Sequence, residues 1–251
     1  MKSFFSLCFM ALLALPLSAQ EDTFPLNRLG LTVEYGMGGC AIVDDYLSHE
    51  RYTGTLPYIG VWYNRLHDGR GFRLGITHQE DDDLENYAIR ASFMRTAVNF
   101  DQIFMMKDFT LFGSPAAWYF GPSVEYFEYE LINRFSSSHK VMSELIMVSM
   151  GINTSLDVEL TRRLTVGFFL RGNVLGVNYK THDELKYADK NSKLQTLISA
   201  NNLNADLQAR YRILKRVSLG LTGKAQYTRS SGWDRSVSFV NSIIAFAIIH
   251  F

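Results

Sequence analysis

Apolar and polar residues alternate with a period of two through most of the chain. The last stretch, residues 236–251, shows the alternation most plainly, because counting back in twos from the final residue gives a face that is apolar except at Asn241. A period of two is that of a β-strand. A strand this apolar is an aggregation hazard in water, so we expect lipid to cover it and barrel neighbours to close its edges. The apolar members of the face are Phe251, Ile249, Ala247, Ala245, Ile243, Phe239 and Val237.

Nine earlier segments alternate in the same way, and polar or glycine-containing connections separate them. Each segment has one apolar face and one face of glycine and polar residues, which is typical of a strand with lipid outside and a crowded lumen inside. In the segment that begins near Asn86, this pattern places Ala91 and Phe93 outward and Arg90 inward. The nine segments span approximately residues 28–40, 55–66, 72–78, 86–97, 116–129, 142–158, 164–173, 200–211 and 217–228.

The ten segments predict an all-β fold, a closed antiparallel up-and-down transmembrane β-barrel, with eight or twelve strands as alternatives. Long polar connections and tight turns mostly alternate, and both chain ends fall on the rim with the short turns. A soluble β-sandwich or lipocalin-like barrel is the alternative fold, with the apolar faces inward. Aromatic residues near segment ends on the apolar face favour the membrane, as a girdle does: Tyr35, Tyr63, Tyr87, Trp118, Phe120, Tyr126, Tyr211 and Tyr227.

Residues 98–116 break the alternation and leave two interpretations open. The fourth and fifth strands are long, with a turn near residues 106–108 and a kink at residues 113–115, or a short helix or loop joins two ordinary strands. Long strands are the interpretation that we favour. The predicted number of strands is the same in both.

The N-terminal residues 1–19 have the layout of a secretory signal peptide, with Lys2, an apolar core and Leu17-Ser18-Ala19 before the expected cleavage site. Residues 20–251 then form a single barrel domain. The chain is 47% hydrophobic and 14% aromatic, and its 25 basic and 25 acidic residues balance. Its apolar runs are too short for a spanning helix after residue 19. The charge balance also gives no indication of a nucleic-acid partner.

Charged residues on the predicted inner faces form a candidate network in the lumen. In a narrow barrel they pair and fill the interior. The alternative is a small-solute channel with a slight anion preference, because the basic residues outnumber the acidic ones. The acidic members are Glu34, Glu125 and Asp206, and the basic members are Arg73, Arg90, Arg171, Arg210 and Lys224.

The C-terminal strand gives the most specific resemblance. Phe251 and Ile249, with the alternating residues before them, resemble the C-terminal assembly signal of small bacterial outer-membrane β-barrel proteins. The resemblance implies insertion by the barrel-assembly machinery into the outer membrane of a Gram-negative cell, in contact with lipid and lipopolysaccharide. It implies an assembly route and no activity.

Two polar clusters in the connections are the candidates for chemistry. Asp81, Asp82 and Asp83 on one connection, with His182 and Asp183 on another, resemble omptin proteases, in which two carboxylates face a His/Asp pair and activate water. The weak catalytic candidates are therefore Asp81, Asp83, His182 and Asp183. His78 is a candidate for lipid hydrolysis only if a hydroxyl such as that of Ser92 lies beside it. Without metal-ligand spacing or a nucleotide motif, we expect no metal, no cofactor and a structural or surface-interaction role.

Overall fold

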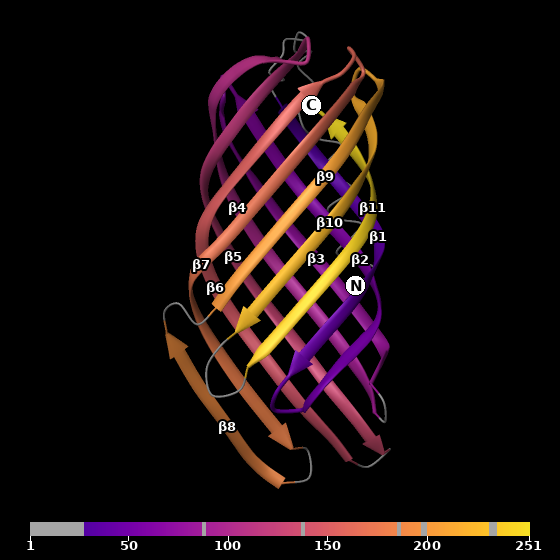
Figure 1. The fold of residues 1–251 in the computed structure, drawn as a ribbon, viewed down its shortest axis with the longest axis vertical. Coiled ribbons are helices and arrows are strands. Elements are labelled where there is room, and N and C mark those ends of the chain that lie inside the picture. The colour runs from indigo at the N-terminus through magenta and orange to yellow at the C-terminus, as the bar shows by residue number, and fades with distance from the viewer. Residues whose placement is uncertain (1–27, 87–88, 137–138, 185–186, 197–199, 231–234) are drawn as a thin grey trace.

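The computed structural model describes residues 28–86, 89–136, 139–184, 187–196, 200–230 and 235–251. These residues form a closed antiparallel β-barrel of ten strands (Figure 1), which confirms the predicted fold and strand number. The expected signal peptide, residues 1–19, lies outside the described residues. Among the described residues, no helix has the length and apolar character needed to cross a membrane.

The barrel closes between the first and last strands. Gly30 pairs with His250 and Asp44 with Ser236, so β1 and β11 are hydrogen-bonded along their full shared length. The eleventh strand of the sheet, β8, pairs with β7 alone and stands outside the ring, while β7 continues the ring to β9. The strands are β1 (Arg28–Asp44), β2 (Ser48–His67), β3 (Arg70–Glu85), β4 (Arg90–Leu111), β5 (Ser114–Ser136), β6 (His139–Glu159), β7 (Leu164–Glu184), β8 (Tyr187–Thr196), β9 (Ala200–Leu214), β10 (Val217–Ser230) and β11 (Ser236–His250).

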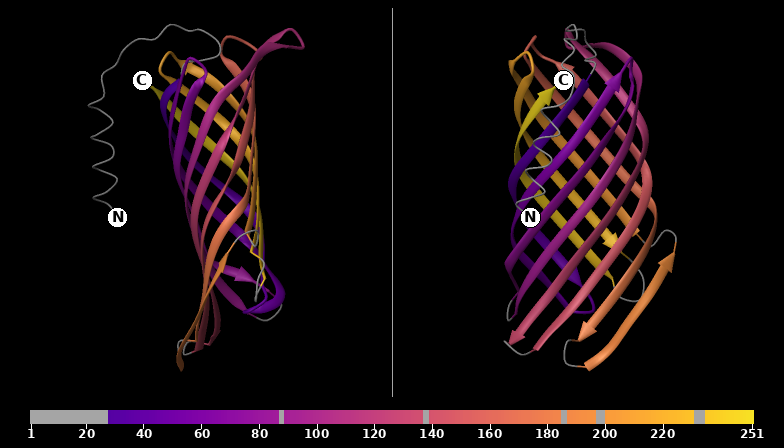
Figure 2. Two further views of the ribbon diagram at one scale, coloured as in Figure 1. Left: turned by 90° about the vertical axis from the view of Figure 1, so that its left-hand side faces the viewer. Right: turned by 180° about the vertical axis from the view of Figure 1, so that it is seen from behind.

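The two ends of the barrel differ. At the upper end in Figure 1, which we call the turn end, short turns join β2 to β3, β4 to β5, β6 to β7 and β9 to β10, and the chain ends there. At the opposite end, the hairpin end, strands continue where the sequence predicts polar connections, as in residues 41–54 and 130–140. The β7–β8 hairpin extends beyond the rest of this end (Figure 2).

Residues 98–116 form long strands, as favoured above, and the turn lies at Phe112 and Gly113 rather than at residues 106–108. Phe112 has φ 49° and Gly113 has φ 81°. The turn between β2 and β3 has the same form, with φ 48° at Asp68 and 72° at Gly69. Two consecutive positive φ angles characterise the type I′ turn, whose twist matches that of the strands it joins.

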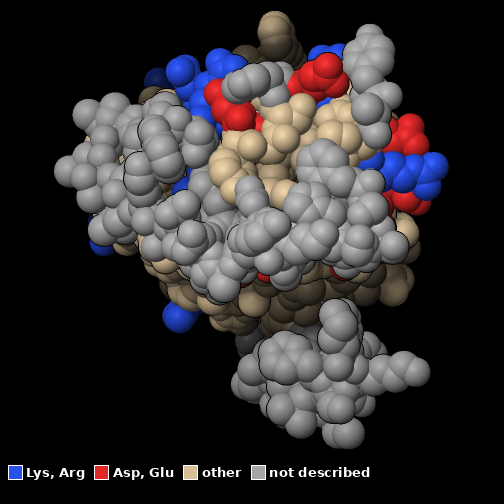
Figure 3. All heavy atoms as spheres, turned by 90° about the horizontal axis from the view of Figure 1, so that it is seen from below, with Lys and Arg blue, Asp and Glu red and all other residues tan. Residues whose placement is uncertain are grey.

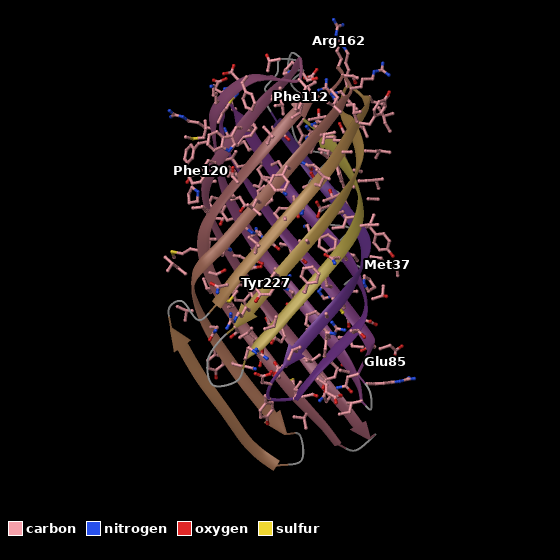
Figure 4. The ribbon with its side chains drawn as sticks, viewed as in Figure 1. Met37, Glu85, Phe112, Phe120, Arg162 and Tyr227 are labelled. Atoms are coloured by element: carbon pink, nitrogen blue, oxygen red, sulfur yellow. The ribbon has the colours of Figure 1, made fainter. Side chains whose placement is uncertain are left out.

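The apolar faces point outward over a band around the barrel, which rules out the inverted, soluble arrangement for this part of the fold. Tyr35 is 62% exposed, Ile152 is 55% exposed and Ile243 is 73% exposed. Met37 and Phe120 project away from the wall (Figure 4). Of the predicted girdle, Tyr87 lies outside the described residues, and the others lie on the outer face.

The faces of β4 were predicted the wrong way round. Ala91 and Phe93 are buried inside the barrel, whereas Arg90 is exposed on the outside. The cause is that the lumen itself is apolar near the hairpin end, so that the rule of apolar residues outward fails there. On β5, the outward residues after Tyr126 are Glu128 and Glu130, and Phe127 begins an apolar inner face.

Glycines on the inner face of β1 allow it to pack closely against β11. A Cβ atom on Gly38 would overlap the carbonyl oxygen of Asn241, whereas one on Gly39, which faces outward, would meet no atom within 4 Å. We therefore predict that Gly38→Ala lowers the free energy of unfolding by about 1–3 kcal/mol, as overpacking does. Gly39→Ala is the matched control and should change it by less than about 0.5 kcal/mol.

Urea unfolding in lipid vesicles, followed by the migration of unheated protein on SDS gels, measures both variants. Equal effects of the two substitutions would show that the overlap with Asn241 is not what makes glycine necessary at residue 38.

Candidate functional site

The lumen near the hairpin end is filled by an apolar layer. Four of its large members, Tyr52, Phe93, Phe127 and Leu131, are at most 1% exposed. The rings of Phe93 and Tyr129 lie 5.7 Å apart in a tilted arrangement. This apolar layer comprises Cys40, Ile42, Tyr52, Leu56, Leu84, Ala91, Phe93, Ala97, Phe127, Tyr129, Leu131, Leu145, Met147 and Val240.

An ion-pair cluster around Glu125 lies next to the apolar layer. Glu125 is 1% exposed and pairs with Arg95 at 3.1 Å and with Arg171 at 3.2 Å. Asn202 also donates a hydrogen bond to the Glu125 carboxylate. Arg171 reaches Asp101 at 3.6 Å. Two guanidinium groups therefore face two carboxylates, and these four charges, which come from β4, β5 and β7, balance.

A second cluster surrounds Glu34 toward the turn end. Its carboxylate accepts hydrogen bonds from the Tyr58 hydroxyl at 2.7 Å and from Trp62 Nε1 at 2.8 Å. Lys224 donates to the Tyr58 hydroxyl at 3.1 Å and lies 3.8 Å from Asp206. The hydroxyl of Tyr58 thus links the charges of Glu34 and Lys224, so that neither is buried without a partner.

Arg73 lies between two aromatic rings in this second cluster. Its guanidinium carbon is 4.5 Å from the centre of the Trp62 ring and 4.7 Å from that of Phe169. A guanidinium between two ring faces gains cation–π attraction on both sides. Together the two clusters occupy the central lumen with paired charges and aromatic rings.

The predicted lumen residues therefore lie inside the barrel, with one correction. Arg90 is on the outer face at the hairpin end, where its side chain is 69% exposed and lies 3.9 Å from Asp83 and 3.7 Å from Glu85. Arg210 is 6% exposed and lines a cavity at the turn end. That cavity measures about 90 Å³, and Glu34, Arg73 and His250 are among its other lining residues.

Sequence reasoning missed a buried charge cluster at the hairpin end. Asp44, 0% exposed, accepts hydrogen bonds from Tyr129 at 3.2 Å, Ser143 at 3.0 Å and Ser236 at 2.7 Å. Lys180, 3% exposed, lies 3.2 Å from the same carboxylate. Both charged residues were assigned to polar connections. The sequence did contain a signal for Lys180, because Asn178 and Lys180 alternate with apolar residues as the inner face of a strand does. This alternation is separated from the preceding one by a change of register between β6 and β7.

The predicted catalytic residues are placed only in part. Asp81 and Asp83 lie on β3 at the hairpin end, and the Asp83 amide donates to the Asp81 carboxylate at 3.1 Å. His182 and Asp183 lie on β7, where their backbones pair with Ser143 and Met142, and their side chains are outside the described residues. Arg90 neighbours Asp83, so at least one carboxylate of the predicted pair has a cationic partner.

On the outer face, His78 contacts a threonine rather than Ser92. Its Nδ1 lies 3.0 Å from the Thr96 hydroxyl, and its Nε2 lies 3.4 Å from Glu80. A hydroxyl, an imidazole and a carboxylate in this order are the components of a nucleophilic triad. However, Thr96 is a ladder residue with His78 on one side and Glu128 on the other. The nearby amides are used in strand pairing, so the backbone offers no donors to stabilise an oxyanion.

Three glutamates lie together next to this group, beyond the apolar band. Ligand oxygens of Glu128, Glu130 and Glu144 all lie within 4.8 Å of one another. Burial, together with the charges of Glu144 and Glu128, raises the pKa of Glu130. Seen from the hairpin end, charged side chains of the described residues lie around uncharged ones (Figure 3). The outer surface around these three glutamates is therefore acidic, whereas the neighbouring band toward the turn end is apolar.

Comparisons with known proteins identify the fold. No protein-family model matches the chain, and no curated protein matches its sequence. The outer membrane protease OmpT from Escherichia coli is similar in structure, with a TM-score of 0.63 at 8% identity over 94% of this chain and 99% of OmpT. Neisserial surface protein A matches with a TM-score of 0.38 at 12% identity, over 88% of this chain and 97% of its own. The chain therefore has the fold of bacterial outer-membrane barrels.

Asp44 and its neighbour Asp45 allow a matched test of the buried charge cluster. Asp44→Asn leaves the Lys180 charge buried without its carboxylate, so we predict a loss of about 3–5 kcal/mol of unfolding free energy. Asp45 pairs with Arg235 at 3.4 Å in a more exposed position, and Asp45→Asn should cost less than about 1 kcal/mol. Urea unfolding in vesicles measures both. A small loss in Asp44→Asn would mean that Lys180 finds another partner.

Proposed function

We propose that the protein is a closed, non-conducting barrel of the bacterial outer membrane, and that its hairpin end is an interaction surface outside the cell. The observation that carries this proposal is the filling of the lumen. The apolar layer, which includes Tyr52, Phe93 and Phe127 at no more than 1% exposure, occupies the lumen near the hairpin end, and paired charges occupy its centre. A solute would have to displace both layers to cross.

The length of the strands supports the position of the interaction surface. A transmembrane strand needs about 9–11 residues. β5 has 23 residues and β4 has 22, so both continue well past the apolar band at the hairpin end. The turn end carries the short turns and both ends of the barrel domain, as the periplasmic rim of such barrels does. The hairpin end then faces outside.

Lipid and lipopolysaccharide are the partners that we propose for the outer wall. The apolar band, with Tyr35, Met37 and Ile243 exposed, suits the lipid interior. Ile249 lies at the end of β11, and Phe251 follows the strand at the turn end. We propose that the barrel-assembly machinery recognises these two residues there. A rim hydrolase receives no support from the described side chains, because Asp81 and Asp83 are not seen with a catalytic histidine.

The closed lumen has a direct electrical consequence. Protein refolded into a planar lipid bilayer should give no discrete conductance steps, because the described side chains of the apolar layer and of the charge clusters fill the lumen between the two ends. A porin reconstituted in the same bilayer is the positive control. Reproducible steps from the refolded protein would refute a closed lumen and support the small-solute channel.

The proposed orientation is tested by labelling cysteines from outside the cell. Glu85 lies at the hairpin end and Arg162 at the turn end, and both are exposed (Figure 4). A membrane-impermeant maleimide should label Glu85→Cys in intact cells, and it should label Arg162→Cys only after the outer membrane is permeabilised. The native Cys40 gives little background because it is 7% exposed inside the barrel. The reverse pattern of labelling would invert the proposed orientation.

A further inference from the structure

A small pocket inside the rim of the turn end collects positive charge. Arg162, Arg163, Arg210 and Arg212 line it together with His250, and Glu159 supplies the one carboxylate in the lining. Its volume is about 10 Å³, and it adjoins the cavity of about 90 Å³, with which it shares Arg210 and His250. Four arginines on one strand and a turn therefore line one concave site.

The strands and turn around the pocket hold these groups in place. Arg210 pairs in the ladder with Thr165 of β7, and Arg212 pairs with Ser218 of β10. The Thr161 hydroxyl accepts hydrogen bonds from the amides of Arg163 at 3.3 Å and Leu164 at 3.0 Å, which shapes the turn that carries Arg162 and Arg163.

Two further contacts connect the turn and the last strand to this wall. The Arg212 amide donates to the Arg163 carbonyl at 2.8 Å. His250 Nε2 lies 2.9 Å from the Ser218 hydroxyl. Strands β9 and β11 therefore carry Arg210, Arg212 and His250, and a hydrogen-bonded turn carries Arg162 and Arg163. Because these backbones are already ordered, the cost of ordering them on binding a ligand is small.

Several basic residues that line one pocket favour an anion there. Like charges that share a concave, partly buried site raise the local potential, and an anion in the site lowers it. Guanidinium groups present planar pairs of N–H donors that match the oxygens of phosphate and carboxylate. A phosphate dianion has the charge and the number of acceptor oxygens to engage several arginines together, which a single carboxylate does not.

We propose that the pocket binds the phosphate group of a small molecule from the solution at the turn end. Arg210 and Arg212 belong to the inner face of β9, so the pocket faces the mouth of the lumen and not the surrounding lipid. A soluble phosphate or phosphomonoester therefore fits the site, and a phospholipid headgroup does not. The assignment of that molecule to the periplasm rests on the orientation proposed above.

Isothermal titration of the full mature protein in maltoside micelles with inorganic phosphate, at constant ionic strength, tests the site. We expect saturable binding with one phosphate per barrel. The exposed pair Arg162→Gln/Arg163→Gln should weaken it about tenfold or more. Lys215→Gln/Arg216→Gln is the matched control, because it removes the same charge from the neighbouring exposed turn outside the pocket and should leave the affinity unchanged.

Three outcomes would overturn the proposal. The first is no binding at about 10 mM phosphate, a concentration that fills a site of millimolar affinity. The second is an equal loss in both double variants, which would indicate only diffuse attraction to a basic rim. The third is competition by phosphatidylglycerol added to the micelles, which would assign the site to a lipid headgroup. Binding in micelles does not depend on orientation, so its failure is distinct from a failure of the labelling pattern.

Discussion

The strands of this barrel have two different surroundings along their length, an apolar band and, toward the hairpin end, a polar exterior. The apolar face of a strand therefore changes from the outside to the inside of the barrel between the two. On β6, Val148 and Met150 point outward in the apolar band, while Ser149 and Asn153 point inward. Farther toward the hairpin end, Glu144 points outward, and Leu145 and Met147 are buried inside. Lipid accepts an apolar outer wall, but water does not. Beyond the membrane, the only place left for the apolar face is the lumen.

The closed lumen is a consequence of this exchange. Inside the membrane-spanning part, the inner face carries charged residues, and these are held in balanced sets such as Glu125 with Arg95 and Arg171. A buried ion pair gains little unless hydrogen bonds complete it. Asn202 at Glu125, and Tyr58 and Trp62 at Glu34, supply those bonds. The polar clusters and the apolar layer therefore fill adjoining lengths of one lumen.

The sequence predicted the fold well because period-two alternation is local, and most strands show it over the length of the apolar band. The same pattern predicts the wrong faces for β4, because this strand runs through both environments. Ala91 and Phe93 lie in the lumen near the hairpin end, and Arg90 lies outside. The cluster of Asp44 and Lys180 was beyond local reasoning. Asp44 and Lys180 are far apart in sequence. Their contact depends on the register between β6 and β7, which shifts between Met150 and Gly151. Pairing across the lumen is set by closure of the ring and not by any one strand.

A closed lumen also limits what binding at either end can do. The arginine pocket opens at the turn end, and the apolar layer lies between it and the hairpin end. A ligand held by Arg162 and Arg163 therefore cannot be a solute in transit, because the path beyond it is filled. Binding there stabilises the native barrel by mass action and joins the turn of β6 and β7 to the wall of β9 through one shared anion. In the orientation proposed above, the two ends are therefore separate surfaces, each facing its own compartment.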